Sequence, residues 1–257
     1  MGSDAIDERL GEADGAVPSI VPDGAQAGEP GVAVRREFML IGNRRRAHLR
    51  LESSSVSRCH AALIRGGNTL YVRDLGSRTG VLVNGSAMRE SDLSDGDFLQ
   101  VGEFLFRVEN PSIASPAAER AGTMPAFLQG SAATFRIEGR GLLIGRRPTC
   151  DVTLDEPAVS AKHALVFELN GVHRVRDLYS RTGTWVNNVQ VKMCQLRPGD
   201  VVRIGHSEFR YVSVQPPAPA PPLPALPVEA IRLEDDEETD ARADSPTNEP
   251  EVATARG

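Results

Sequence analysis

The stretch IGRRPTCDVTLDEPAVSAKH, from Ile144 to His163, occurs in related form earlier in the chain as IGNRRRAHLRLESSSVSRCH, from Ile41 to His60. In both copies a glycine ends an apolar run, and a serine and a histidine three residues apart close the stretch. His163 lies 103 positions after His60, and the match continues without a gap to Phe106 and Phe209. An ungapped self-match of this length indicates two tandem domains built on one pattern.

The chain of 257 residues has room for two domains of roughly 90 residues, a size that can bury its own core. We expect the first domain at 18–109 and the second at 125–214. Residues 110–124 are small and predict a linker. We expect the acidic N-terminus, 1–17, and the proline-rich and then acidic tail, 215–257, to be disordered, because neither can bury an apolar core.

Short apolar runs separated by turn residues fill both copies. AALIR and TLYVRDL flank Gly66-Gly67-Asn68, which predicts a hairpin, and Asn84-Gly85 predicts another turn. No segment shows a sustained 3.6-residue apolar period, so no substantial helix is expected. The fold class is therefore all-β: two tandem antiparallel β-sandwiches. We expect Trp185, the single tryptophan, in a sandwich core.

Charge and composition argue against nucleic acid and membranes as partners. A net charge of −6 gives no general reason to expect nucleic acid or an anionic membrane as partner, although the first copy is rich in arginine. No apolar run is as long as a membrane span, and the N-terminus does not resemble a signal peptide. The sequence therefore predicts a cytoplasmic protein with no membrane or nucleic-acid partner.

The cysteines and motifs give no sign of an enzyme. Cys59, Cys150 and Cys194 are odd in number and lack a CxxC spacing, which predicts free thiols rather than disulfides or a zinc site. No P-loop, GxSxG, HExxH or kinase signature occurs. We predict a protein without catalytic residues, cofactor or bound metal.

Several motifs recur in the same order in both copies. In the second copy they are Gly145-Arg146, Ser160-x-x-His163, Asp177-Leu178-x-Ser180-x-x-Gly183 and Val186-Asn187. The first copy keeps Gly42, Ser57-Arg58-x-His60, Asp74-Leu75-x-Ser77-x-x-Gly80 and Val83-Asn84. With this ordered set, each copy resembles the forkhead-associated (FHA) domain, a β-sandwich that binds phosphothreonine peptides.

The resemblance implies an eleven-stranded sandwich with its ligand site on loops at one end. It implies that Arg146 contacts the phosphate, with Arg147 beside it, and that Ser160 donates a hydroxyl hydrogen bond to a phosphate oxygen. Arg181 and Thr182 would hold the peptide.

The remaining motif positions receive roles by the same resemblance. Three residues of the second copy would shape the loops without touching ligand: Gly145, His163 and Asn187. Their counterparts in the first copy are Gly42, His60 and Asn84. The corresponding binding residues of the first copy are Ser57, Arg58, Arg78 and Thr79.

The chemistry of phosphate suits these residue types. A phosphothreonine carries about −1.5 to −2 charges at neutral pH and three strong acceptor oxygens. A guanidinium and fixed hydroxyl donors match those oxygens, at about 1.5–3 kcal/mol for each charge-assisted hydrogen bond. Because unphosphorylated threonine offers none of these contacts, such a pocket could make binding strictly dependent on phosphorylation.

Two departures from the family pattern stand out. Asn43 occupies the position of Arg146 in the first copy, so the main phosphate cation is missing there unless Arg44 or Arg58 replaces it. Thr79 and Thr182 stand where the family usually has asparagine, and a threonine lacks the paired donor and acceptor of an amide. The first copy is therefore predicted to be degenerate.

The sequence predicts a phosphothreonine-dependent adaptor in Ser/Thr kinase signalling, with the second copy as the main binding module. Its partners would be phosphothreonine-containing proteins, a Ser/Thr protein kinase or its substrates. The alternative is a structural scaffold that assembles proteins independently of phosphate. A further hypothesis is that Thr239 of the acidic tail, once phosphorylated, docks into the second copy, because the proline-rich spacer gives it reach.

Overall fold

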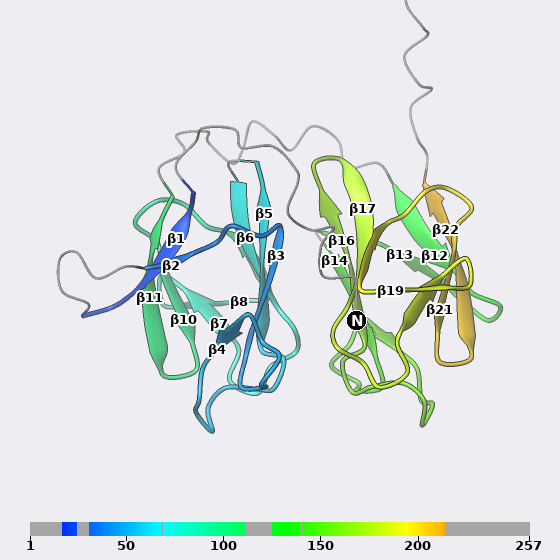
Figure 1. The fold of residues 1–257 in the computed structure, drawn as a ribbon, viewed down its shortest axis with the longest axis horizontal. Helices are drawn as coiled ribbons and strands as arrows, with labels where there is room; N and C mark the ends of the chain where they lie inside the picture. The colour runs from blue at the N-terminus through cyan, green and yellow to red at the C-terminus, as the bar shows by residue number, and fades with distance from the viewer. Residues whose placement is uncertain (1–16, 25–30, 68, 111–124, 140, 214–257) are drawn as a thin grey trace, which may run out of the picture. The chain divides into compact units, whose positions relative to one another are not determined.

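The chain folds into two β-sandwiches, one from β1–β11 and one from β12–β22 (Figure 1). This computed structural model describes residues 17–24, 31–67, 69–110, 125–139 and 141–213. Within those residues no helix forms, and hence none that is long and apolar enough to cross a membrane. The predicted N-terminal segment, linker and acidic tail, including Thr239, lie almost wholly outside them.

In the first sandwich a six-stranded sheet faces a five-stranded one. The six-stranded sheet has the order β2 (Val32–Ala33), β1 (Ser19–Pro22), β11 (Phe104–Glu109), β10 (Phe98–Val101), β7 (Val81–Val83) and β8 (Ser86–Met88). The five-stranded sheet has the order β4 (Leu49–Arg50), β3 (Phe38–Gly42), β5 (Ala61–Gly66), β6 (Thr69–Asp74) and β9 (Glu90–Asp92).

The second sandwich repeats this arrangement strand for strand. Its six-stranded sheet runs β13 (Thr134–Arg136), β12 (Ala126–Gln129), β22 (Ser207–Ser213), β21 (Val201–Ile204), β18 (Thr184–Val186) and β19 (Val189–Val191). Its five-stranded sheet runs β15 (Val152–Thr153), β14 (Gly141–Gly145), β16 (Ala164–Leu169), β17 (Val172–Asp177) and β20 (Met193–Gln195).

The predicted all-β sandwich class is confirmed, with eleven strands in each sandwich. Pairing is antiparallel except for β3–β4 and β14–β15, which are parallel and which the sequence did not indicate. The β5–β6 hairpin forms where expected. The β7–β8 turn does too, because Asn84 and Gly85 take the positive φ angles of 50° and 78° that a two-residue hairpin needs.

Trp185 does not lie in a core, which corrects the sequence prediction. Side chains alternate along β18, so Thr184 and Val186 point into the sandwich and Trp185 points out, half-buried. The Arg203 guanidinium covers its ring, 4.7 Å from the ring centroid.

Each sandwich has its own apolar core, and a third cluster joins them. That third cluster takes buried side chains from the outer faces of both five-stranded sheets: Phe38, Leu40, Ile64, Tyr71 and Leu75 from the first, and Leu143, Leu165, Phe167, Leu169 and Leu178 from the second. The central strands are therefore buried on both faces, which explains the unbroken apolar runs FMLIG and GLLIG.

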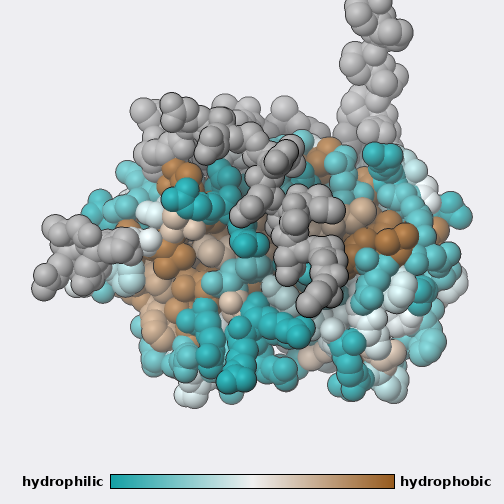
Figure 2. Space-filling model, in the orientation of Figure 1, coloured by the Kyte–Doolittle hydropathy of each residue, from teal (hydrophilic) through white to brown (hydrophobic). Residues whose placement is uncertain are grey.

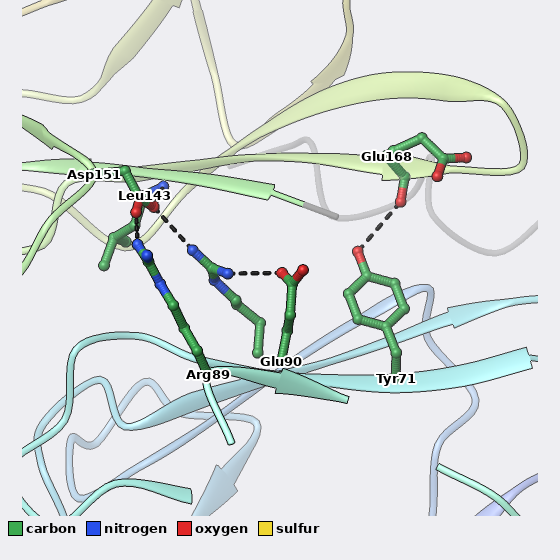
Figure 3. Close-up of polar contacts among 7 residues, drawn as sticks. Tyr71, Arg89, Glu90, Leu143, Asp151 and Glu168 are labelled. Carbon is green, nitrogen blue, oxygen red and sulfur yellow. Dashed lines mark hydrogen bonds and ion pairs between the residues drawn. The ribbon is translucent and has the colours of Figure 1, made fainter. Parts of the chain in front are cut away.

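Polar groups also cross between the two sheets. The Arg73 guanidinium, only 5% exposed, lies 2.7 Å from Glu90 of its own sandwich and 2.9 Å from Asp151 of the other. Arg89 also contacts Asp151, and Tyr71 Oη donates to Glu168 O at 3.2 Å (Figure 3). The buried cation thus has a carboxylate from each sandwich.

Removing Asp151 should destabilise the fold strongly. In Asp151→Ala the buried Arg73 guanidinium loses one of its two carboxylates, for an expected loss of about 3–5 kcal/mol in the free energy of unfolding. Urea denaturation of the full chain measures this loss. The matched control is Glu52→Ala, whose partner Arg50 is 41% exposed, with an expected loss below about 1 kcal/mol. Equal losses in the two variants would contradict the importance of the buried pair.

Candidate functional site

Three loops of the second sandwich meet through hydrogen bonds at one end of the fold. The backbone N–H of Arg146, in the loop after β14, donates to Ser160 O at 2.9 Å. The backbone N–H of Arg181, in the loop between β17 and β18, donates to Ser160 Oγ at 3.0 Å. Arg146 and Arg181, two predicted site residues from distant parts of the sequence, are thereby brought into contact with Ser160. In Figure 2 the lower end, where Figure 1 shows loops, is mostly hydrophilic.

Ser160 and Arg146 keep donors available for a ligand. A hydroxyl has one donor and two acceptor sites. The Ser160 hydroxyl accepts from Arg181 N, and it donates to no acceptor among the described residues. The Arg146 side chain is exposed, and in the described part of the chain its guanidinium makes no hydrogen bond or ion pair. A free cation and a free hydroxyl donor therefore lie on neighbouring, hydrogen-bonded segments.

His163 connects two of these loops from beneath. Its Nδ1 accepts from Ser160 N at 3.1 Å, so Nε2 carries the proton and donates to Gly183 O, also at 3.1 Å. Burial lowers the pKa of His163, which keeps this neutral tautomer. Gly145 is required nearby, because a Cβ there would lie 2.6 Å from Ala161 O. Both residues shape the loops without reaching the surface.

A second set of bonds shapes the β17–β18 turn. Asp177 accepts from Ser180 N at 2.9 Å, and Ser180 Oγ in turn accepts from Gly183 N at 2.9 Å. This turn presents Arg181 and Thr182 outward, and both are exposed. The recurrence of D-x-x-S-x-x-G in both copies is the sequence signal for it.

Not every predicted binding side chain is free. The Thr182 hydroxyl donates to Ala158 O at 2.9 Å, and the Arg181 guanidinium contacts Pro157 O. Thr182 can therefore offer a ligand only its acceptor sites. Arg147 is exposed with a free guanidinium among the residues described. Asn187 lies at the β18–β19 hairpin, where its amide bonds Asp200 and Val201 N.

The first sandwich repeats these contacts. Ser57 Oγ accepts from Arg78 N at 3.1 Å, and Thr79 Oγ1 donates to Ser55 O at 3.1 Å. His60 accepts from Ser57 N at 3.0 Å and bonds Gly80 O at 2.9 Å. Asn84 and Gly42 make the same kinds of contact as Asn187 and Gly145. The Asn84 amide bonds Asp97 and Phe98 N, and the Gly42 backbone lies against the Arg58 carbonyl.

The cations differ between the two sandwiches. The Asn43 amide donates to Ser53 O at 2.8 Å within its own loop. Arg44 is held by the other sandwich, where its guanidinium donates to Leu178 O at 2.7 Å. Of the two arginines that could replace the missing cation, only Arg58 is exposed and without a side-chain partner in the described residues.

The same two segments match a known domain family. The FHA domain family matches residues 39–102 and 142–205. The chain belongs to the FHA-domain family. Each sandwich is one FHA domain, and such domains are binding modules. Among the residues described, no three His, Cys, Asp or Glu side chains gather in a way that could hold a metal ion.

Similar proteins include regulators. The FHA domain-containing protein FhaA of Mycobacterium tuberculosis is 38% identical over 79 residues, which are 31% of this chain and 15% of FhaA. The oxoglutarate dehydrogenase inhibitor of Corynebacterium efficiens is 35% identical over 117 residues, 41% of this chain and 78% of the inhibitor. The chain thus spans only a small part of FhaA and most of the inhibitor.

A solved FHA domain, described for phosphothreonine-dependent interactions, is 34% identical. It aligns with 36% of this chain and 98% of its own, with a TM-score of 0.34.

Acid should weaken the fold through the bridging histidines. Burial lowers the pKa of His60, His163 and His173, so the unfolded chain binds protons more readily than the folded one below about pH 6.5. The free energy of unfolding should be flat above that pH and should fall below it, by up to about 1.4 kcal/mol per pH unit for each histidine. Urea titrations between pH 5 and 8 measure the slope.

His163→Gln should flatten this slope, because it removes one buried histidine whose pKa is lowered in the folded protein. A slope that is the same in native protein and His163→Gln would contradict the buried neutral histidine.

Proposed function

We propose that the protein is a non-enzymatic, cytoplasmic adaptor that binds phosphothreonine-containing proteins, with the second sandwich as its main phosphopeptide site. The observation that carries this proposal is the Ser160 hydroxyl beside the exposed Arg146, because among the described residues neither the hydroxyl proton nor the guanidinium has a partner. A phosphate supplies a negative charge to pair with the guanidinium and an acceptor oxygen for the hydroxyl proton.

The backbone geometry supports a pre-formed site. His163 and Asp177 hold the serine loop and the β17–β18 turn in place through internal bonds. Little ordering cost is then left for ligand binding, which favours affinity for a small anionic group. Arg147 adds long-range attraction, and Arg181 and Thr182 border the site with the peptide backbone as their proposed partner.

The partners we propose are a Ser/Thr protein kinase, its substrates, or other proteins that such a kinase phosphorylates. Support comes from the family and from the names of two regulators that it contains, a glycogen accumulation regulator of Mycolicibacterium smegmatis and the oxoglutarate dehydrogenase inhibitor. Both names describe control of a metabolic process.

Arg146→Ala should weaken the binding of phosphothreonine peptides. Each charge-assisted hydrogen bond contributes about 1.5–3 kcal/mol, so the affinity should fall by roughly 10- to 100-fold. Calorimetry of the full chain with phosphothreonine, phosphoserine and unphosphorylated peptide libraries measures this. Arg136→Ala, at an exposed arginine on β13 away from the loops, should bind like the native protein.

Binding that is indifferent to phosphate, or unaffected by Arg146→Ala, would overturn the proposal. Association that survives phosphatase treatment would instead support a phosphate-independent scaffold.

We also infer that the acidic tail is a ligand for the second sandwich once Thr239 is phosphorylated. The tail supplies a threonine in an acidic setting after a proline-rich spacer, which gives a high effective concentration. Kinase-treated native protein should then bind an external phosphothreonine peptide more weakly than untreated protein. A Thr239→Ala chain that loses as much affinity on kinase treatment as native protein would exclude this role for Thr239.

A further inference from the structure

The ligand loops of the two sandwiches touch each other. From the loop after β3, Arg44 donates to Leu178 O at 2.7 Å and Tyr179 O at 3.2 Å, directly before the turn that carries Arg181. In the reverse direction, Thr149 of the loop after β14 packs on Gly76, directly before the turn that carries Arg78; a Cβ at Gly76 would lie 2.8 Å from Thr149 Oγ1. Each ligand end therefore supports the other.

The two serine loops are also in contact. Lys162 Nζ, two residues after Ser160, donates to Cys59 O at 2.7 Å, and Cys59 directly follows Arg58. The covalent path from Ser160 to Lys162, the hydrogen bond to Cys59 and the step to Arg58 together limit the separation of Ser160 and Arg58. The limit is on the order of 20 Å, because one residue spans at most about 3.6 Å. An extended peptide of about six residues covers that distance.

The first sandwich keeps part of a phosphate pocket. The Ser57 hydroxyl accepts from Arg78 N and, like that of Ser160, donates to no acceptor among the described residues. The Arg58 carbonyl lies against Gly42, the residue before Asn43, and so the Arg58 side chain starts beside the position that holds the cation in the other sandwich. One hydroxyl and one displaced cation form an incomplete pocket, which should bind phosphate weakly on its own.

The ligand loops of the two sandwiches together carry more positive charge than one phosphate can neutralise. Five exposed arginines of these loops have no side-chain partner among the described residues: Arg45, Arg46, Arg58, Arg146 and Arg147. Nearby carboxylates are mostly engaged, since Glu52 pairs with Arg50 and Glu156 accepts from Ser207 and His206. Two exposed carboxylates are exceptions among the described residues: Asp155, and Glu103, whose backbone N–H donates to Ser55 Oγ.

We propose that the two loop ends form one composite site for a segment with two phosphorylated residues about six residues apart. A phosphothreonine occupies the Ser160–Arg146 pocket, and the second phosphate occupies the Ser57–Arg58 pocket. This proposal rests on the proposed function of the second sandwich. Once the first phosphate is bound, the second meets its weak pocket at an effective concentration near the millimolar range, so the weak pocket contributes to affinity.

Calorimetry of the full chain tests the composite site with synthetic peptides. One set carries a single phosphothreonine with degenerate flanks, and a second set adds another phosphothreonine three to eight residues away. A third set replaces that second phosphothreonine with glutamate. At the best spacing the doubly phosphorylated peptide should bind at least tenfold more tightly than the single one, with one peptide per chain, and the glutamate peptide should fall between them.

Arg58→Ala should bring the doubly phosphorylated peptide down to the affinity that native protein has for the single one. Arg107→Ala, an exposed arginine on β11, is the matched control and should keep the full gain. Equal binding of single and double peptides at every spacing, or two peptides per chain, would overturn the composite site and leave the proposed function intact. A gain that survives both Arg58→Ala and Ser57→Ala would also overturn it. Binding without dependence on phosphate would refute the proposed function itself.

Discussion

Burial of the central strands on both faces is the constraint on which this structure depends. Strands β3, β5, β14 and β16 meet their own sandwich on one face and the other sandwich on the opposite face. Two side chains that meet there are Phe38 and Phe167, with ring centroids 5.8 Å apart. Because apolar area removed from water contributes about 25 cal/mol per Å², neither five-stranded sheet can expose this face without a large loss of stability.

The duplicated loops share one hydrogen-bonded backbone but carry different cations. The histidine bridge and the serine-centred hydrogen bonds are the same in both sandwiches, so the same internal contacts hold the loop backbone in each. The cations have diverged on this common backbone. Arg146 is exposed in the second sandwich, whereas Arg44 of the first has become part of the contact with Leu178 and Tyr179.

Much of this could be predicted from the sequence, because the repeat, the turn residues and the ordered motifs are local signals. The hairpin at Asn84-Gly85 and the meeting of Arg146 with Ser160 follow from them. The contact between the sandwiches could not, since an apolar run such as FMLIG indicates a buried strand but not what covers its second face. The bond from Thr182 to Ala158 and the outward position of Trp185 likewise depend on register, which composition does not specify.

The thiols buried between the sandwiches allow the contact to be followed by chemical modification. Cys59 and Cys150 belong to the shared apolar cluster and are 6% and 7% exposed, and burial raises the pKa of Cys150. Because both thiols are packed in this cluster, separation of the two sheets should expose them to a thiol reagent. Half-buried Cys194 belongs to a different cluster and provides an internal reference. The rate of modification thus reports how often the two halves of the molecule separate, with no label added to the chain.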